Sequence, residues 1–584
     1  MDHIGHQRTP AIADMERAEV RISKSLSDGE KRAIASRKQE VKKGLAKLGI
    51  QCDMDKIPNI TVLGSGGGLR AMIALYGTLL GLKEYKLLDC IMYLAGVSGS
   101  TWCMSALYGT GDWVQNIELV EKRLCETLAN SDWDLEEARE AAMEASEDEC
   151  YSLTDLWAYF IVQRMLKELD KSELSMHRRS CETGKNPYPI YAAVDKETHH
   201  KQNAGTWLEF TPHEAGIPGL GAFVDTKYFG SVFEEGQMCE KKEEKCIGYL
   251  RGLWGSALGS AEDNFNAIID ILKHFLHLCA KYGKSRPGSS TKFGDQDIEI
   301  VVQAYQVLLE LLQHLSDGRT DEKLFDNFEK ILKDHRGSRS HGQIKRMRQI
   351  WHSLDPEERK KECMKLDEAL DIDFGGVKEM KKQQLQYGSR IEASIFRFLI
   401  FMKKTLSCLC GWTWGSTNNF LYQCSNVKLP ELTNKRVLYF IDAGLSINTP
   451  YPLVLRPERQ AKLILSFDFS AGDPFETIKQ AAKFCKENGM RFPKIDEKEL
   501  QDTDNPSDCY IFKGENAPTV MHFPLFNKVN CPGKIDEYRN QFGTFKMSYL
   551  EREIVKLLTA AKKNVANVRQ KIVEEIKCVA CPLS

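Results

Sequence analysis

The sequence predicts an α/β fold in which helices flank a central, mostly parallel sheet, with a helical lid or insertion. Two observations carry this prediction. A strand, a turn and a helix follow one another twice between residues 59 and 108, and such alternation is typical of a parallel sheet. Apolar and β-branched runs return in "KRVLYFIDAGL" and "AKLILSFDFS" after a long, charged helical region.

The first elements can be placed individually. Ser27 and Glu30 have the spacing of a helix-capping box, so we expect a helix from there to Gly49 within a helical N-terminal segment, residues 1–50. A strand is expected at 59–63 and a helix at about 69–82. The apolar run 87–95, bounded by Gly96, is interpreted as a second buried strand.

Two later regions are helical. Residues 257–405 form a charged insertion with two polar loops, "GKSRPGSSTKFGDQD" and "DHRGSRSHGQ". In the C-terminal region, 545–584, residues 549–578 form an amphipathic helix that either lies on a membrane surface or packs on the catalytic domain. We expect a single domain, residues 1–584, without a C2 domain.

Composition excludes several classes of protein. The chain has 584 residues, of which 42% are hydrophobic and 28% charged, and its 80 basic and 82 acidic side chains argue against nucleic-acid binding. No apolar run reaches the roughly 18 residues of a membrane span, and no signal peptide is recognisable, so we expect a cytoplasmic protein. The 18 cysteines lack zinc-binding spacing, and we expect no metal and no cofactor.

The stretch "GSGGGLRAM", residues 64–72, places four glycines in five positions between a strand and a helix. A tight turn needs only one or two glycines, so we expect a phosphate or an oxyanion to approach the backbone at this helix N-terminus. A dinucleotide-binding loop would need a small residue in place of Leu69, and a P-loop would need Gly-Lys-Ser/Thr after the turn. Neither condition is met.

A serine nucleophile is indicated by "GVSGS", residues 96–100, where Ser98 occupies a turn between a strand and a helix, as in G-x-S-x-G hydrolases. The pattern is common by chance, but the neighbouring glycine loop could stabilise the oxyanion that forms when Ser98 attacks a carbonyl. Asp442 and Asp468 stand at the ends of the two later predicted strands. The only histidine after them in the sequence is His522, which lies in an apolar stretch where a packed side chain is expected. Asp442, at a strand end beside small residues, is our candidate base, although it could simply end a turn.

Eight stretches together resemble one family over nearly the whole chain: "GSGGGLRAM", "GVSGSTW", "NPYPIYAAVD", "WLEFTPHEAG", "GLWGSA", "IDAGLSINTPYPLVLRPER", "SFDFSAGD" and "APTVMHFPLFN". They resemble the catalytic domain of the cytosolic (group IV) phospholipase A2 family, which has a patatin-like α/β fold with a lid. The resemblance implies the roles of the site residues: Ser98 as nucleophile, Asp442 as its catalytic partner, Gly67 and Gly68 as oxyanion donors, and Arg70 and Arg459 as ligands of the substrate phosphate.

Two features make the chain look like the calcium-independent, gamma-type branch. Only about 60 residues precede the glycine loop, too few for the C2 domain of calcium-dependent members. The last four residues, "CPLS", form a possible prenylation box at Cys581, with Cys578 as a possible palmitoylation site. We therefore expect a lipid-anchored protein on intracellular membranes such as the endoplasmic reticulum.

The expected function is calcium-independent hydrolysis of the sn-2 ester of membrane phospholipids through a Ser–Asp dyad and an acyl-enzyme. Lysophospholipids are expected as further substrates and as acyl acceptors in transacylation. A neutral-lipid hydrolase and a catalytically idle membrane-binding protein on the same scaffold are the alternatives.

Overall fold

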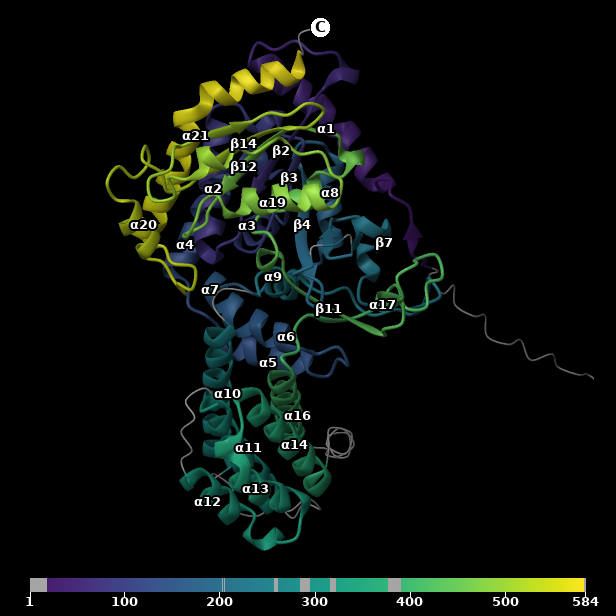
Figure 1. Cartoon of the computed structure of the whole chain (residues 1–584), viewed down its shortest axis with the longest axis vertical. Helices are drawn as coiled ribbons and strands as arrows, with labels where there is room; N and C mark the ends of the chain where they lie inside the picture. Colours follow the sequence, from purple (N-terminus) through teal and green to yellow (C-terminus); the bar gives the residue numbers. More distant parts are fainter. Residues whose placement is uncertain are drawn as a thin grey trace, which may run out of the picture.

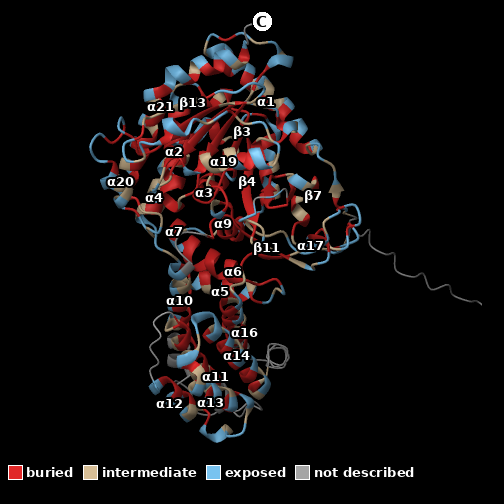
Figure 2. Ribbon diagram, viewed as in Figure 1, coloured by how far each residue is buried: buried red, intermediate tan, exposed pale blue. Residues whose placement is uncertain are grey.

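The computed structural model describes residues 18–201, 203, 205–256, 261–283, 295–315, 322–375 and 390–581. It has a body built around one large sheet, from which a group of helices projects as an arm (Figure 1). The burial pattern in Figure 2 runs through the sheet of the body and continues along the inner sides of the arm helices. The expected α/β class is confirmed.

Five parallel strands form the centre of the sheet, in the order β4-β3-β2-β12-β14. Their bounds are β4 (Tyr188–Asp195), β3 (Tyr93–Gly96), β2 (Asn59–Gly64), β12 (Ala461–Asp468) and β14 (Thr519–Pro524). These strands are almost entirely buried, which explains why they appear in the sequence as continuous apolar runs.

Antiparallel strands flank this parallel centre on both sides, so the sheet is mixed rather than mostly parallel. Beyond β4 lie β5 (Trp207–Phe210), β6 (Glu214–Ile217), β7 (Ala222–Asp225) and β1 (Arg21–Ile22), and β13 (Tyr510–Phe512) borders β14. A second antiparallel neighbour of β4 is β11 (Val437–Asp442), which also pairs with β10 (Ser416–Asn418). A separate hairpin joins β8 (Val232–Glu234) to β9 (Gln237–Glu240).

The first predicted elements agree closely with the structure. Helix α1 (Asp28–Lys47) begins after Ser27, whose hydroxyl accepts a hydrogen bond from the Glu30 N–H, as the cap prediction required. The strand expected at 87–95 is shorter than predicted, because β3 starts only at Tyr93 and residues 88–90 form a 3₁₀ turn. The charged Asp89 within this turn binds Lys47 at the surface, which a buried strand would not allow.

Helices cover both faces of the sheet (Figure 1). Besides α1, the helices outside the arm are α2 (Gly68–Glu84), α3 (Gly99–Tyr108), α4 (Trp113–Asn130), α5 (Leu135–Ala145), α6 (Leu153–Trp157), α7 (Gln163–Leu166), α8 (Arg178–Glu182), α9 (Ile247–Trp254), α17 (Pro430–Thr433), α18 (Tyr451–Val454), α19 (Glu476–Glu487), α20 (Ile535–Gln541) and α21 (Glu551–Ala580) among the described residues. Of these, α5, α6 and α7 lie where the arm joins the body (Figure 1).

The arm occupies the range in which the sequence predicts an insertion. It consists of α10 (Ala261–Gly283), α11 (Asp295–Gln313), α12 (Glu322–Ile331), α13 (Arg339–Ile350), α14 (Pro356–Phe374) and α16 (Arg390–Gly411). Most of the first predicted loop lies outside the described residues. The prediction of the second loop is partly wrong, because α13 begins inside that stretch, with Ser338 as its N-cap.

The C-terminal helix α21 packs on the body through its apolar face. Its residues Leu558, Ala561 and Val565 are nearly or fully buried against α2. Two glycines of α2 permit this approach: a Cβ at Gly77 would lie 2.7 Å from the Leu558 carbonyl oxygen, and one at Gly81 would lie 3.0 Å from Val565 Cβ. Of the two alternatives for this amphipathic face, packing on the body is therefore confirmed and burial in a membrane surface is wrong.

A buried ion cluster lies at the start of the parallel strands. The Arg459 guanidinium donates through all five of its N–H groups, to Glu30 (2.9 and 3.0 Å), Glu209 (2.7 and 3.2 Å) and the Leu453 carbonyl (2.7 Å). Arg456 also binds Glu209. Burial favours a raised pKa for Glu209, but Arg459 and Arg456 hold that pKa below its usual value.

This position contradicts the prediction that Arg459 binds the substrate phosphate. Arg459 precedes the first residue of β12, and its carbonyl oxygen accepts a hydrogen bond from Asn59, the first residue of β2. The glycine loop follows the last residue of β2, six residues further along the strand, or about 20 Å away. Arg459 therefore connects α1, β5 and β12 and has no donor left for a phosphate.

We expect Arg459→Met to lower the free energy of unfolding by about 3–5 kcal/mol, because it leaves the buried Glu30 without its cation and Glu209 with Arg456 alone. Urea unfolding measures the change. The control is Lys435→Met, which breaks the exposed ion pair with Glu197 and should cost less than about 1 kcal/mol. If the Arg459→Met protein were fully stable but bound phospholipid more weakly, Arg459 would after all be a ligand of the substrate phosphate.

Candidate active site

The glycine loop and the Ser98 turn lie side by side at the ends of neighbouring strands. Gly64, the last residue of β2, is paired with Gly96, the last residue of β3. Ser98 then caps α3 with a φ of 51°, a left-handed conformation that is strained for a residue with a side chain. Such a strained turn between a strand and a helix is the geometry expected of an exposed nucleophile in this class of fold.

The two turns are packed too closely for side chains at several positions. A Cβ at Gly99 would lie 1.9 Å from the Gly68 carbonyl oxygen, and one at Gly66 would lie 2.9 Å from Ser98 Cβ. Ser100 connects the turns, because its hydroxyl donates a 2.6 Å hydrogen bond to the Ser65 carbonyl. Several of the glycines are thus required by contact between the two backbones.

Two backbone N–H groups of the loop have no partner among the residues that the structure describes. Gly67 and Gly68 adopt φ values of 142° and 59°, and neither N–H donates a hydrogen bond within the described part of the chain. The Gly66 N–H, in contrast, is held by Asn448, through its carbonyl oxygen at 3.1 Å and its Oδ1 at 3.2 Å. Since Gly68 is also the first residue of α2, these free donors point out of a helix N-terminus and are suited to bind an oxyanion.

Strand register brings Asp442 to the level of Ser98. Gly96 of β3 lies opposite Tyr191 of β4, and Ala193, two residues further along β4, lies opposite Asp442 of β11. Ser98 is likewise two residues beyond Gly96. β5 borders the other side of β4 over residues 191–194, so β3 and β11 lie one after the other along the same side of β4. Asp442 therefore lies where a continuation of β3 toward residue 98 would run, which places it close to Ser98.

Local hydrogen bonds fix the position of Asp442, which is only 1% exposed. Its Oδ1 accepts a 2.8 Å hydrogen bond from the Gly444 N–H, and its own N–H donates to Ser256 Oγ at 3.0 Å. A Cβ at Gly444 would lie 3.1 Å from Asp442 Oδ1 and 3.7 Å from Val97 Cγ1. The turn after Asp442 thus touches the residue next to the nucleophile.

His522 lies far from this pair. It belongs to β14, three strands from β3, which corresponds to about 14 Å. Its ring is fully buried, and Nε2 hydrogen-bonds to the Pro474 carbonyl at 2.7 Å. Burial lowers the pKa of His522. These features are those of a packed histidine, as the apolar sequence around it predicts.

Arg70, in the first turn of α2, folds back over the glycine loop. Its guanidinium donates to the carbonyls of Phe469 and Phe542, both at 2.6 Å, and to Thr544 Oγ1 at 3.1 Å. A Cβ at Gly67 would lie 2.5 Å from Arg70 Nη2. Arg70 is 2% exposed, and burial lowers its pKa. In the described residues no carboxylate is close enough to form an ion pair with it.

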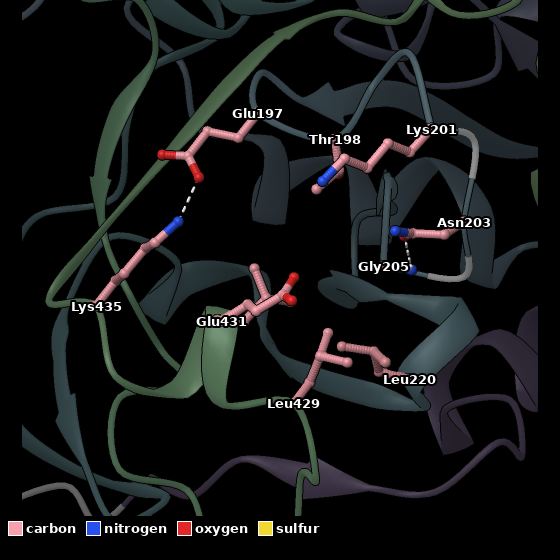
Figure 3. Close-up of a pocket in the computed structure, with 10 residues that line it drawn as sticks. Glu197, Thr198, Lys201, Asn203, Gly205, Leu220, Leu429, Glu431 and Lys435 are labelled. Carbon is pink, nitrogen blue, oxygen red and sulfur yellow. Dashed lines mark hydrogen bonds and ion pairs between the residues drawn. The ribbon is translucent and has the colours of Figure 1, made fainter.

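The site is covered in this structure, since Ser98 is 3% exposed. A cavity of about 260 Å³ lies elsewhere, beside the loop after β4 (Figure 3). It is bordered by Leu220, Leu429 and the ion pair of Glu197 with Lys435, and none of the predicted site residues lines it. We therefore identify the site from its hydrogen-bond donors and strand register rather than from this cavity.

The remaining predicted residues lie at the chain terminus. Cys578 and Cys581 are exposed at the end of α21, and residues 582–584 fall outside the described part. Among the residues that the structure describes, no helix is long and apolar enough to span a membrane. Within the same residues, no group of three or more histidine, cysteine, aspartate or glutamate side chains could hold a metal ion.

Sequence reasoning missed two residues that support the site. The backbone and side-chain oxygens of Asn448 both accept hydrogen bonds from the Gly66 N–H, and Ser256 Oγ accepts one from the Asp442 N–H. Asn448 lies 382 positions from Gly66 in the sequence, so no local pattern could link them. Ser256 was inside the quoted motif "GLWGSA", but nothing there indicates its partner.

Comparisons with known proteins agree with this geometry. A family model described as a lysophospholipase catalytic domain matches residues 60–274. The chain is 39% identical to cytosolic phospholipase A2 gamma of Homo sapiens, over 96% of this chain and 97% of that protein, and 37% identical to its Mus musculus counterpart, over 95% and 92%. The structure of human GIVD cytosolic phospholipase A2 has the same fold, with a TM-score of 0.64 at 24% identity, over 97% of this chain and 69% of that chain. The chain thus belongs to the group IV cytosolic phospholipase A2 family, in its gamma-type branch.

Proposed function

We propose that this chain is a serine phospholipase A2 that hydrolyses the sn-2 acyl ester of glycerophospholipids. Asp442 accepts the proton of Ser98 Oγ while that oxygen attacks the ester carbonyl carbon, and a tetrahedral oxyanion forms. Collapse of this intermediate breaks the ester C–O bond, and the departing lysophospholipid oxygen takes the proton from Asp442. Water, deprotonated by Asp442, then attacks the acyl carbon on Ser98. The bond from that carbon to Ser98 Oγ breaks, Oγ takes the proton back from Asp442, and the fatty acid is released.

The observation that carries the proposal is the pair of N–H groups of Gly67 and Gly68, which have no partner among the described residues and lie beside the strained Ser98 turn. Donors fixed in advance toward a developing oxyanion can contribute about 2.7–4 kcal/mol each to transition-state stabilisation. An idle lipid-binding protein would have no use for this arrangement, so the second of the two alternatives is disfavoured. Because Ser98 and Asp442 are buried, the segments above them must move before an acyl chain can enter.

Arg70 favours a phospholipid over a neutral glyceride. Its buried guanidinium is bound by carbonyl and hydroxyl oxygens, without a carboxylate among the described residues, so a phosphate can supply the missing negative charge. A lysophospholipid has the same phosphate and one acyl ester, and we include lysophospholipase activity. The same acyl-enzyme would transfer its acyl group to a lysophospholipid when that acceptor replaces water, which is transacylation.

We further propose that the whole chain is one catalytic domain that acts without calcium and is held at intracellular membranes by its C-terminus. Calcium independence is supported by the similarity to gamma-type members and by a mechanism whose base, nucleophile and oxyanion donors are all protein groups. The apolar face of α21 is buried on α2, so this helix cannot insert that face into a bilayer, although its exposed basic face could still attract anionic lipid. A prenyl group on Cys581 with a palmitoyl group on Cys578 would provide the two signals that stable anchoring requires.

The dyad is tested by substitution. Ser98→Ala and Asp442→Asn should each lower hydrolysis of a fluorogenic short-chain ester and of a phospholipid by about a thousandfold or more, because nucleophile and base act as one unit. The control, His522→Gln, should keep activity within about threefold of the unmodified protein once thermal unfolding shows that it is folded. An active Asp442→Asn protein beside an inactive, folded His522→Gln protein would contradict the dyad.

Membrane anchoring is tested by fractionation of cells in the presence of a calcium chelator. Cys581→Ser should move the protein from the membrane to the soluble fraction and leave hydrolysis of detergent-dispersed phospholipid unchanged. Cys239→Ser, which alters another exposed cysteine, is the control and should stay on membranes. A C-terminus without a lipid group by intact-mass analysis would contradict the lipid anchor. Release by the chelator alone of the protein without any substitution would contradict calcium independence.

A further inference from the structure

The segment from Phe542 to Tyr549, which binds Arg70 through Phe542 and Thr544, contains a polar group without a partner among the described residues. The hydroxyl of Tyr549 is buried, with the residue 4% exposed, and no described group hydrogen-bonds to it. A buried hydroxyl without a partner costs free energy, and such a cost is often explained by a ligand that completes the site.

Aromatic packing fixes Tyr549 relative to Arg70. The Tyr549 ring is stacked on Phe542 with centroids 5.8 Å apart and planes within 10°, and Phe542 is in turn stacked on Phe526. The carbonyl oxygen of Phe542 accepts the 2.6 Å hydrogen bond from Arg70 Nη1. Both side chains therefore contact Phe542: the Tyr549 ring packs on its ring, and the Arg70 guanidinium binds its carbonyl oxygen.

The two groups also interact electrostatically. Burial raises the pKa of Tyr549 to about 12, while the positive charge of Arg70 opposes that rise. The hydroxyl consequently keeps its proton at neutral pH and is available as a donor. Arg70 uses three of its five N–H groups within the described residues, and no described group accepts a hydrogen bond from the Tyr549 hydroxyl, so both side chains have donors to offer a ligand.

We propose that Tyr549 is a specificity-determining residue that donates a hydrogen bond to the phosphate of the phospholipid, next to Arg70. This inference rests on the proposed function, because the ligand is the phosphodiester of that substrate. The Arg70 guanidinium lies over Gly67, an oxyanion donor, so the donors for phosphate and for ester are neighbours. In a glycerophospholipid the sn-2 ester and the phosphate are likewise carried by adjacent glycerol carbons.

The test compares two inhibitors of short-chain ester hydrolysis in the full-length protein: a non-hydrolysable diether phospholipid and the corresponding dialkylglycerol, which lacks the phosphate. Tyr549→Phe keeps the ring stack and removes only the hydroxyl. We expect it to weaken inhibition by the diether phospholipid roughly tenfold, the typical loss of a hydrogen bond to a charged group, and to leave inhibition by the dialkylglycerol unchanged. Both inhibition constants come from one sample, so any unfolded fraction cancels in their ratio.

Tyr76→Phe is the matched control, because Tyr76 also has a buried hydroxyl without a described partner and lies on α2, the helix of Arg70. It should change neither inhibition constant. Inorganic phosphate, added as a third inhibitor, distinguishes recognition of the lipid headgroup from that of any phosphate: a Tyr549-dependent effect of the diether lipid alone assigns the site to the headgroup, and an effect of both ligands assigns it to phosphate in general.

Unchanged or equally weakened inhibition by the two lipids in Tyr549→Phe would overturn the role of Tyr549. Failure of the proposed function itself would look different, because the unmodified protein would then release no fatty acid from a diacyl phospholipid.

Discussion

The site depends on close contact between two backbones, those of the glycine loop after β2 and the turn after β3. Gly64, Gly66 and Gly99 stand where any Cβ would overlap the opposite turn. This contact brings the N-terminus of α2 against the strained Ser98, together with two N–H groups that no described residue binds. A single side chain at Gly99 would push the two helices apart and misalign the donors, so these glycines are a packing requirement and only secondarily a matter of backbone freedom.

Two buried arginines illustrate how environment decides between structure and recognition. Arg459 is neutralised by Glu30 and Glu209 and uses every donor, so it stabilises the start of the parallel strands. Arg70 is bound only by neutral oxygens, at the opposite end of the same strands, and keeps donors for an incoming anion. A buried cation without a counter-ion is costly, and a protein retains one where a ligand provides the charge. Under our proposal, the segment from Phe542 to Tyr549 is part of the substrate site.

Sequence reasoning recovered the parts of the molecule that local pattern determines. The helix cap at Ser27, the glycine loop and the Ser98 turn each result from neighbouring residues. The antiparallel flanks of the sheet could not be foreseen, because short strands such as β5 and β6 carry no alternation that distinguishes them from loops. Arg459 and Asn448 needed the fold. The sequence places Arg459 just before the strand run "AKLILSFDFS", but it could not show that Glu30 and Glu209 bind the arginine there, nor that Asn448 meets Gly66.

The central claim, that Ser98 reacts while Gly67 and Gly68 bind the oxyanion, is tested most directly by a crystal structure of the covalent adduct with a lipid fluorophosphonate. The account predicts phosphorus bonded to Ser98 Oγ and a phosphonyl oxygen about 2.7–3.1 Å from the nitrogens of both Gly67 and Gly68. An adduct on another residue, or a phosphonyl oxygen directed away from both N–H groups, would contradict it.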